Sequence, residues 1–139
     1  MQLNSYLIFN GQCEAAFKFY EQCLGGKITT MMTHAESPDS EMAQVPPEWR
    51  DKILHVGLMV GNQELMGSDS LPDYYEKPQG FSVSIGIDDP AKAERIFNAL
   101  AENGKVQMPL QQTFWAYRFG MLVDQFSIPW MINCEVVAE

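Results

Sequence analysis

The order of predicted structural elements repeats once along the chain, and this repeat constrains the fold more than any other sequence feature. A short apolar segment at residues 6–9 precedes a helical pattern at 13–24, and three further strand-like segments follow. From residue 81 the same order begins again. A Gly-Lys pair follows each helical segment, Gly26-Lys27 and Gly104-Lys105, and the two pairs lie 78 residues apart. The sequence therefore predicts an α+β fold built from two βαβββ repeats.

Both helical segments have one apolar face, and we expect that a single βαβββ unit cannot bury this face alone, so that the two units join. Asp88-Asp89-Pro90 predicts the start of the second helix, because an acidic residue caps the first turn and proline suits the first helical position. The apolar positions are Ala16, Phe17, Tyr20, Cys23 and Leu24 in the first helix, and Ala93, Ile96, Phe97 and Leu100 in the second.

The remaining strands are expected where apolar and β-branched residues gather between turn signals. In the first repeat these segments are 27–32, 53–60 and 64–67; in the second they are 81–87, 105–110, 114–119 continuing through 121–123, and 130–136. Residues 34–50 contain Pro46-Pro47 and several acidic residues, which predicts a loop with one short helical turn.

We expect a single domain over residues 1–139, with repeat one at 1–68, a linker at 69–79 and repeat two at 80–139. Joined sheets would form a curved, cup-like mixed sheet with the helices outside. The concave side of such a sheet suits a small molecule.

Composition excludes several classes of function. The chain has 139 residues with nine Lys and Arg against 18 Asp and Glu, a net charge of −9, and this acidity disfavours nucleic acids and anionic membranes as partners. No apolar run approaches the roughly 20 residues of a membrane helix, and the N-terminal residues lack the basic region of a signal peptide. Three cysteines without a CxxC or Cys/His spacing indicate reduced thiols and a cytoplasmic protein.

Several short motifs occur together and in one order along the chain. They are Tyr6-Leu-Ile-Phe-Asn-Gly11, Leu24-Gly25-Gly26, His55 with Leu65-Met-Gly-Ser-Asp69, Tyr117-Arg-Phe-Gly120, Asp124-Gln-Phe126 and Trp130-Met-Ile-Asn133. In these motifs the chain resembles the glyoxalase/bleomycin-resistance/extradiol-dioxygenase superfamily, also called vicinal oxygen chelate. Within it, the chain is similar to the PhnB-like branch, which is often labelled 3-demethylubiquinone methyltransferase-like. The resemblance covers nearly the whole chain and implies a homodimer.

Enzymatic members of this superfamily hold a divalent metal with His and Glu side chains from the first and last strands of each half. The resemblance places these four positions at Ser5, Met66, Ser82 and Met131, with Glu64 and Phe81 as neighbours in register. None of the four is a His or a Glu, and a stable site normally takes three or more protein ligands. We therefore expect no bound metal and no cofactor. A methyltransferase would also need a nucleotide site, and the chain has no GxGxxG turn.

His55 is the best candidate for acid–base chemistry, because imidazole titrates near neutral pH. The alternative is a histidine of the core or pocket wall. Asp69 and Asp124 end what we expect to be equivalent hairpin regions, and either could bind a ligand amine or cap its own turn. The residues expected to line the pocket are Ser5, Leu7, His55, Glu64, Met66, Ser82, Trp115, Tyr117, Phe119 and Met131.

Trp115, Tyr117 and Phe119 alternate along a predicted strand, so we expect their rings on one face, with Arg118 on the other. They would form an aromatic wall, part of the core, or a dimer contact. The favoured hypothesis is a metal-free protein that binds a small aromatic or cationic molecule, since acidic clefts concentrate cations. The alternatives are a metal-dependent lyase or isomerase of glyoxalase type, using His55 and Glu64, and a non-catalytic interaction module.

Overall fold

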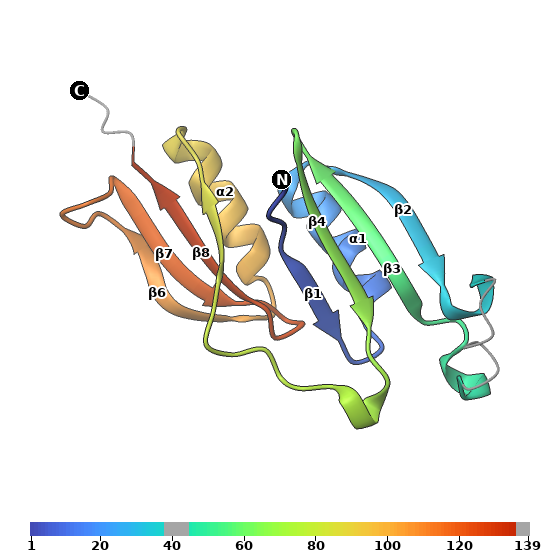
Figure 1. Cartoon of the computed structure of the whole chain (residues 1–139). Coiled ribbons are helices and arrows are strands. Elements are labelled where there is room, and N and C mark those ends of the chain that lie inside the picture. The colour runs from blue at the N-terminus through green and yellow to red at the C-terminus, as the bar shows by residue number, and fades with distance from the viewer. Residues whose placement is uncertain (38–44, 136–139) are drawn as a thin grey trace. The chain divides into compact units, whose positions relative to one another are not determined.

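The computed structural model describes residues 1–37 and 45–135 and divides the chain into two compact units. Unit one is Met1–Glu76 and unit two is Lys77–Glu139, so their boundary falls inside the linker predicted at 69–79. Each unit has one helix and one four-stranded sheet (Figure 1). The predicted α+β fold with two βαβββ repeats is confirmed.

Unit one follows the predicted element order closely. Its elements are β1 (Tyr6–Phe9), α1 (Cys13–Leu24), β2 (Lys27–Thr33), β3 (Ile53–Val60) and β4 (Gln63–Asp69). The sheet order is β1-β4-β3-β2, with β1 parallel to β4 and the other pairs antiparallel. In the described part of the 34–50 loop there are two short 3-10 turns where the sequence predicted one, at His34–Glu36 and Pro47–Trp49.

Unit two repeats this topology with different strand lengths. Its elements are β5 (Val83–Gly86), α2 (Pro90–Ala101), β6 (Lys105–Gln111), β7 (Arg118–Val123) and β8 (Pro129–Cys134), in the sheet order β5-β8-β7-β6. The prediction of a strand at 114–117 is wrong, because these residues form bends and β7 begins only at Arg118. The predicted end of the last strand at residue 136 lies outside the described residues.

A local signal sets one end of each helix. The Asp89 side chain accepts a hydrogen bond from the Ala91 N–H at 3.1 Å, and Pro90 occupies the first turn, as predicted. Helix α1 ends at Gly25, whose φ of 73° lies in the left-handed region that glycine adopts at little cost.

The two cores have the same construction, in which aromatic residues of the helix lie over glycines of the sheet. A Cβ on Gly67 of β4 would come within 2.6 Å of the Phe17 ring, and one on Gly120 of β7 within 2.6 Å of the Phe97 ring. Both rings are buried. The absence of a side chain at these two positions lets each helix pack closely on its sheet.

Asp69, which is 4% exposed, joins three segments of unit one. Its Oδ1 accepts hydrogen bonds from the backbone N–H groups of Gly11 and Cys13, at 2.9 and 3.0 Å, and its Oδ2 accepts one from Ile53 at 2.9 Å. The carboxylate thus links the end of β4 to the β1–α1 turn and to the first residue of β3. This is a structural role, but it is not the local turn cap that the sequence suggested.

Asp124 in unit two is also 4% exposed, but it caps the turn in which it lies. Its Oδ1 accepts hydrogen bonds from the N–H groups of Phe126 and Ile128 at 2.7 and 3.1 Å, and its Oδ2 accepts one from the Trp130 indole at 2.8 Å. The expected equivalence of Asp69 and Asp124 is wrong. Asp69 ends the last strand of its unit, whereas Asp124 follows β7, the strand before the last.

We expect Asp69→Asn to lower the free energy of unfolding by about 3 kcal/mol, because an amide NH₂ would replace an oxygen that accepts a hydrogen bond from a buried N–H. Asp124→Asn should have an effect of similar size. Urea denaturation of the variants measures both values. The matched control is Asp73→Asn, a change of the same chemistry at an exposed position of unit one. A loss below about 1 kcal/mol at Asp69 would contradict the assigned role.

Candidate functional site

Each unit has a sheet face that its own helix does not cover. In β1, Leu7 and Phe9 are buried on the side of α1, whereas Tyr6 and Ile8 are exposed on the opposite side. Because successive strand residues point to opposite faces, this alternation and the strand register together assign each residue of the sheet to one face or the other. We call the uncovered side the open face of unit one; it carries Tyr6, Ile8, His55, Gly57, Glu64, Met66 and Ser68.

Leu7 was predicted to line the pocket, and the structure contradicts this. Its side chain is 2% exposed, and its Cα pairs with that of Gly67, whose missing side chain makes room for Phe17 of α1. Leu7 is therefore a core residue. Ser5 lies immediately before β1 and contributes a backbone contact, since its carbonyl accepts the Met66 N–H at 3.1 Å.

The open face of unit one brings together three of the predicted site residues, His55, Glu64 and Met66. Tyr6 joins them, with its Oη 3.1 Å from His55 Nδ1 and the two rings 5.7 Å apart. Sequence reasoning missed Tyr6, although the alternation of residues 6–9 contains the signal, because Leu7 and its neighbours must face opposite sides.

The Glu64 carboxylate lies over Gly57 on this face. A Cβ on Gly57 would be only 2.8 Å from Glu64 Oε2, so the glycine leaves the space that the carboxylate occupies. Met66 pairs with Gly57 on one side and with Tyr6 on the other. Unit one therefore presents an aromatic hydroxyl, an imidazole and a carboxylate on one sheet face.

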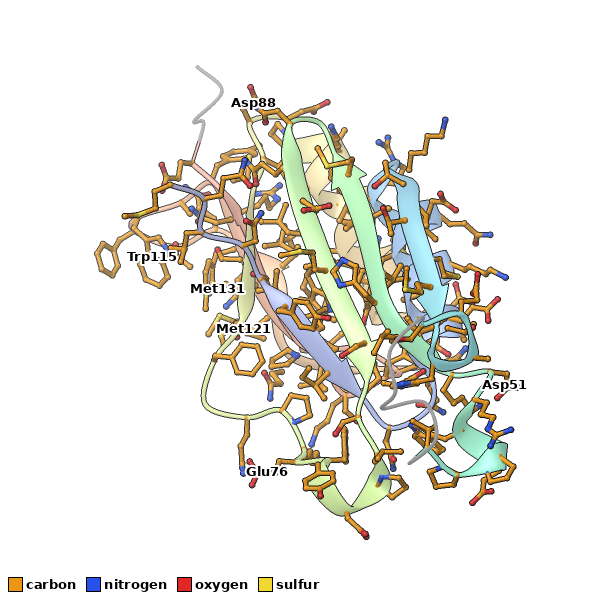
Figure 2. All side chains as sticks on the ribbon, turned by 45° about the vertical axis from the view of Figure 1, so that its right-hand side comes forward. Asp51, Glu76, Asp88, Trp115, Met121 and Met131 are labelled. Carbon is orange, nitrogen blue, oxygen red and sulfur yellow. The ribbon has the colours of Figure 1, made fainter. Side chains whose placement is uncertain are left out.

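A groove of about 1000 Å³ lies on the corresponding face of unit two. Met121 and Met131 are cross-strand neighbours in β7 and β8 (Figure 2), and both line the groove. Of the predicted site residues, Ser82 and Met131 line it. The lining residues are Lys77, Pro78, Gln79, Gly80, Phe81, Ser82, Asn103, Gly104, Lys105, Gln107, Met121, Val123, Asp124, Gln125, Ser127, Pro129 and Met131.

The aromatic residues before and within β7 do not form the predicted single wall. Trp115 contacts Phe119 edge-on at 5.3 Å and Phe114 at 4.8 Å, whereas the ring of Tyr117 stacks on the Arg118 guanidinium at 4.3 Å. These contacts differ from the prediction because residues 114–117 bend instead of alternating along a strand. None of these aromatic residues lines the groove.

The buried thiol of Cys13 is not a candidate nucleophile. Burial raises the pKa of Cys13 well above its usual range, and the nearby Asp69 and Glu14 carboxylates raise it further. The thiolate is the reactive form of cysteine, so a thiol with a raised pKa stays protonated and inert.

The residues present do not fit a metal centre. Within residues 1–37 and 45–135, no group of three or more His, Cys, Asp or Glu side chains lies close enough together to hold an ion. The resemblance implied ligands at four positions, where thioethers and hydroxyls replace the usual imidazole and carboxylate: Ser5, Met66, Ser82 and Met131. In the same described segments, neither helix is long and apolar enough to cross a membrane.

Comparison with known proteins identifies the family. The family model described as 3-demethylubiquinone-9 3-methyltransferase matches residues 1–133. Protein YjdN of Escherichia coli K12 is 33% identical, with 96% of this chain and 95% of YjdN covered. The crystal structure of protein PA1353 from Pseudomonas aeruginosa is 50% identical, with a TM-score of 0.89 and 99% of both chains covered.

At the level of the fold alone, the likeness extends further. A glyoxalase/bleomycin resistance protein/dioxygenase family enzyme from Burkholderia phytofirmans is 14% identical, with a TM-score of 0.64 and 96% and 97% of the two chains covered. The motifs, the two βαβββ units and the family match agree. The chain belongs to the 3-demethylubiquinone-9 3-methyltransferase family, and it shares its fold with a glyoxalase/bleomycin resistance protein/dioxygenase family enzyme.

Proposed function

We propose that this protein binds a small organic molecule in the groove of unit two. The observation that carries the proposal is the groove itself, about 1000 Å³ on the sheet face that α2 leaves uncovered. Pockets for small ligands usually measure about 300–1,000 Å³ and combine an apolar surface with a few polar groups. Family membership supports the fold but does not assign a reaction, because one fold can serve many functions.

The lining of the groove suits an organic ligand. Met121, Val123, Pro129 and Met131 from β7 and β8 supply an apolar floor, and methionine side chains adapt to irregular shapes. Amide and hydroxyl side chains add hydrogen-bonding groups, which are Gln79, Ser82, Asn103, Gln107, Gln125 and Ser127. A ligand could therefore bury an apolar body against the floor while its polar groups stay hydrogen-bonded.

The open face of unit one favours a second candidate function, a lyase or isomerase of glyoxalase type. The observation is the contact between Tyr6 Oη and His55 Nδ1 at 3.1 Å, on the same face as the Glu64 carboxylate. A tyrosine hydroxyl that donates to Nδ1 would leave Nε2 protonated, and the opposite tautomer would leave Nε2 free to accept a proton. In this candidate His55 is the general base, and Tyr6 fixes its orientation.

We also propose that the protein is a cytoplasmic homodimer. Its three cysteines are free, and two of them, Cys13 and Cys134, are buried, which suits a reducing compartment. The dimer is implied by the resemblance. Sedimentation analysis that gave only the 15.8 kDa monomer would remove the dimer from the proposal.

Filling the groove should abolish ligand-induced stabilisation. A ligand at 100 times its Kd adds about 2.7 kcal/mol, so the unfolding midpoint should rise by on the order of 10 °C. In a thermal-shift screen of aromatic, cationic and anionic metabolites, compounds that stabilise the natural protein should have no effect on Met131→Trp. The control is Gln112→Trp, a change of the same size at an exposed residue of unit two outside the groove. Equal stabilisation of both variants would place the ligand elsewhere.

Chelation distinguishes the metal-dependent version of the second candidate. Since no three-ligand cluster occurs among the described residues, we expect dialysis against EDTA to leave the unfolding midpoint unchanged within about 1 °C. Elemental analysis before dialysis should give less than about one-tenth of an ion per chain. A midpoint that falls with EDTA and recovers with Mn²⁺, Ni²⁺ or Zn²⁺ would favour the metal-dependent lyase.

A further inference from the structure

The charges around the groove differ in sign from the charge of the whole chain. Among the residues that line it, only Lys77, Lys105 and Asp124 are charged. The net charge of −9 favours a cationic ligand only if the acidic residues lie near the groove. The preference of this site depends on which of its three charged groups remain available to a ligand.

Asp124 is not available, because its carboxylate is already satisfied inside the protein. Two backbone N–H groups donate to Oδ1 and the Trp130 indole donates to Oδ2, and the residue is 4% exposed. A ligand ammonium group would have to displace these buried hydrogen bonds. The cost of leaving three buried donors unpaired makes Asp124 a poor partner for a cation.

The two lysines are available. Both are exposed, and neither has a carboxylate within salt-bridge distance among the residues that the structure describes. The Cα of Lys105 at the start of β6 pairs with that of Val123 of β7, and both residues line the groove. Lys77 comes from the segment before β5. Two separate segments of unit two therefore bring an ammonium group to the same groove.

The remaining acidic excess lies mainly in unit one. Residues 1–76 contain 11 acidic and four basic residues, a net charge of −7, whereas residues 77–139 contain seven and five, a net charge of −2. Salt screens exposed charges beyond about 10 Å at 0.1 M ionic strength, so the charged groups that line the groove act more strongly on a bound ligand than any carboxylate farther away than this.

We propose that the groove takes a small organic anion, a molecule with an apolar body and a carboxylate, phosphate or sulfonate group that Lys105 and Lys77 bind. This inference rests on the proposed function and names the ligand class of the same site. The methionine floor would contact the apolar body, and the neighbouring amides of Gln79 and Gln107 would donate further hydrogen bonds to the anionic group.

A pair of fluorescent aromatic probes of opposite charge tests this assignment on the full-length protein. The anionic probe is 1-anilinonaphthalene-8-sulfonate and the cationic probe is thioflavin T. We expect the anionic probe to bind more tightly, and Lys105→Gln and Lys77→Gln each to raise its Kd about threefold to fivefold. Raising the salt concentration should weaken binding to the natural protein more than to the double variant.

The control variant is Lys92→Gln, which removes an exposed lysine of α2 that does not line the groove. It should leave the Kd of the anionic probe unchanged, whereas Met131→Trp should abolish binding. Tighter binding of thioflavin T, lost in Met131→Trp, would overturn the anion assignment while keeping the proposed function. Anionic binding that survives Met131→Trp, or equal weakening by Lys92→Gln, would also overturn it. If Met131→Trp changed the binding of neither probe nor of any compound in the thermal screen, the proposed function would fail as well.

Discussion

One helix covers only one face of a four-stranded sheet, and the functional surface of this protein follows from that constraint. In each unit the side chains that face the helix are large and apolar, and glycines at positions 67 and 120 let the Phe17 and Phe97 rings approach the strands. The apolar side chains on this face are thus committed to packing against the helix. The opposite face carries residues that do not pack against the helix, such as the Tyr6–His55 pair and the methionines of the groove.

The two buried aspartates show how a fold can use residues that look functional in the sequence. Asp69 and Asp124 each accept hydrogen bonds from three N–H donors, so both carboxylates are engaged within their own unit. Asp69 connects the end of β4 to the β1–α1 turn, 56 to 58 residues away in sequence, and to the start of β3, so its carboxylate joins the segments on both sides of β4. Because the Asp124 carboxylate is already hydrogen-bonded, the two lysines are the charged groups of the groove that remain available to a ligand.

The sequence predicted the fold better than it predicted the site, and the reason lies in the range of the interactions. Asp89 and Pro90 mark the start of helix 90–101 and Gly25 marks the end of helix 13–24, and these local signals are recognisable in the sequence. The alternation of strand residues is also visible in the sequence. Applied strictly to residues 6–9, it places Tyr6 and Leu7 on opposite faces of the sheet, and Tyr6 is the one on the open face. The bend at 114–117 could not be anticipated from spacing, because an alternating aromatic pattern suits a strand as well as a bend.

The groove also depends on contacts that no local pattern contains. It forms where the segment at 77–81 meets the ends of β6, β7 and β8, so its lining comes from four places in the chain. Of these residues, the sequence singled out only Ser82 and Met131 as pocket residues. Register across β7 and β8 determines that Met121 lies beside Met131, and register is set by the whole sheet.

Net charge describes solubility and long-range attraction, but the charges that touch a ligand are local. Here the two scales disagree, because most of the acidic excess belongs to unit one while the groove in unit two offers two lysines and an occupied carboxylate. A free cation in solution is attracted to the chain as a whole, yet within the groove no unpaired carboxylate receives it. For an organic anion the two effects are reversed. The net charge of the chain repels it weakly at a distance, and the two lysine ammonium groups attract it within the groove. Salt screens the long-range repulsion more than it screens the contacts with the ammonium groups. The charge of the groups that line the groove should therefore decide which ligand stays bound.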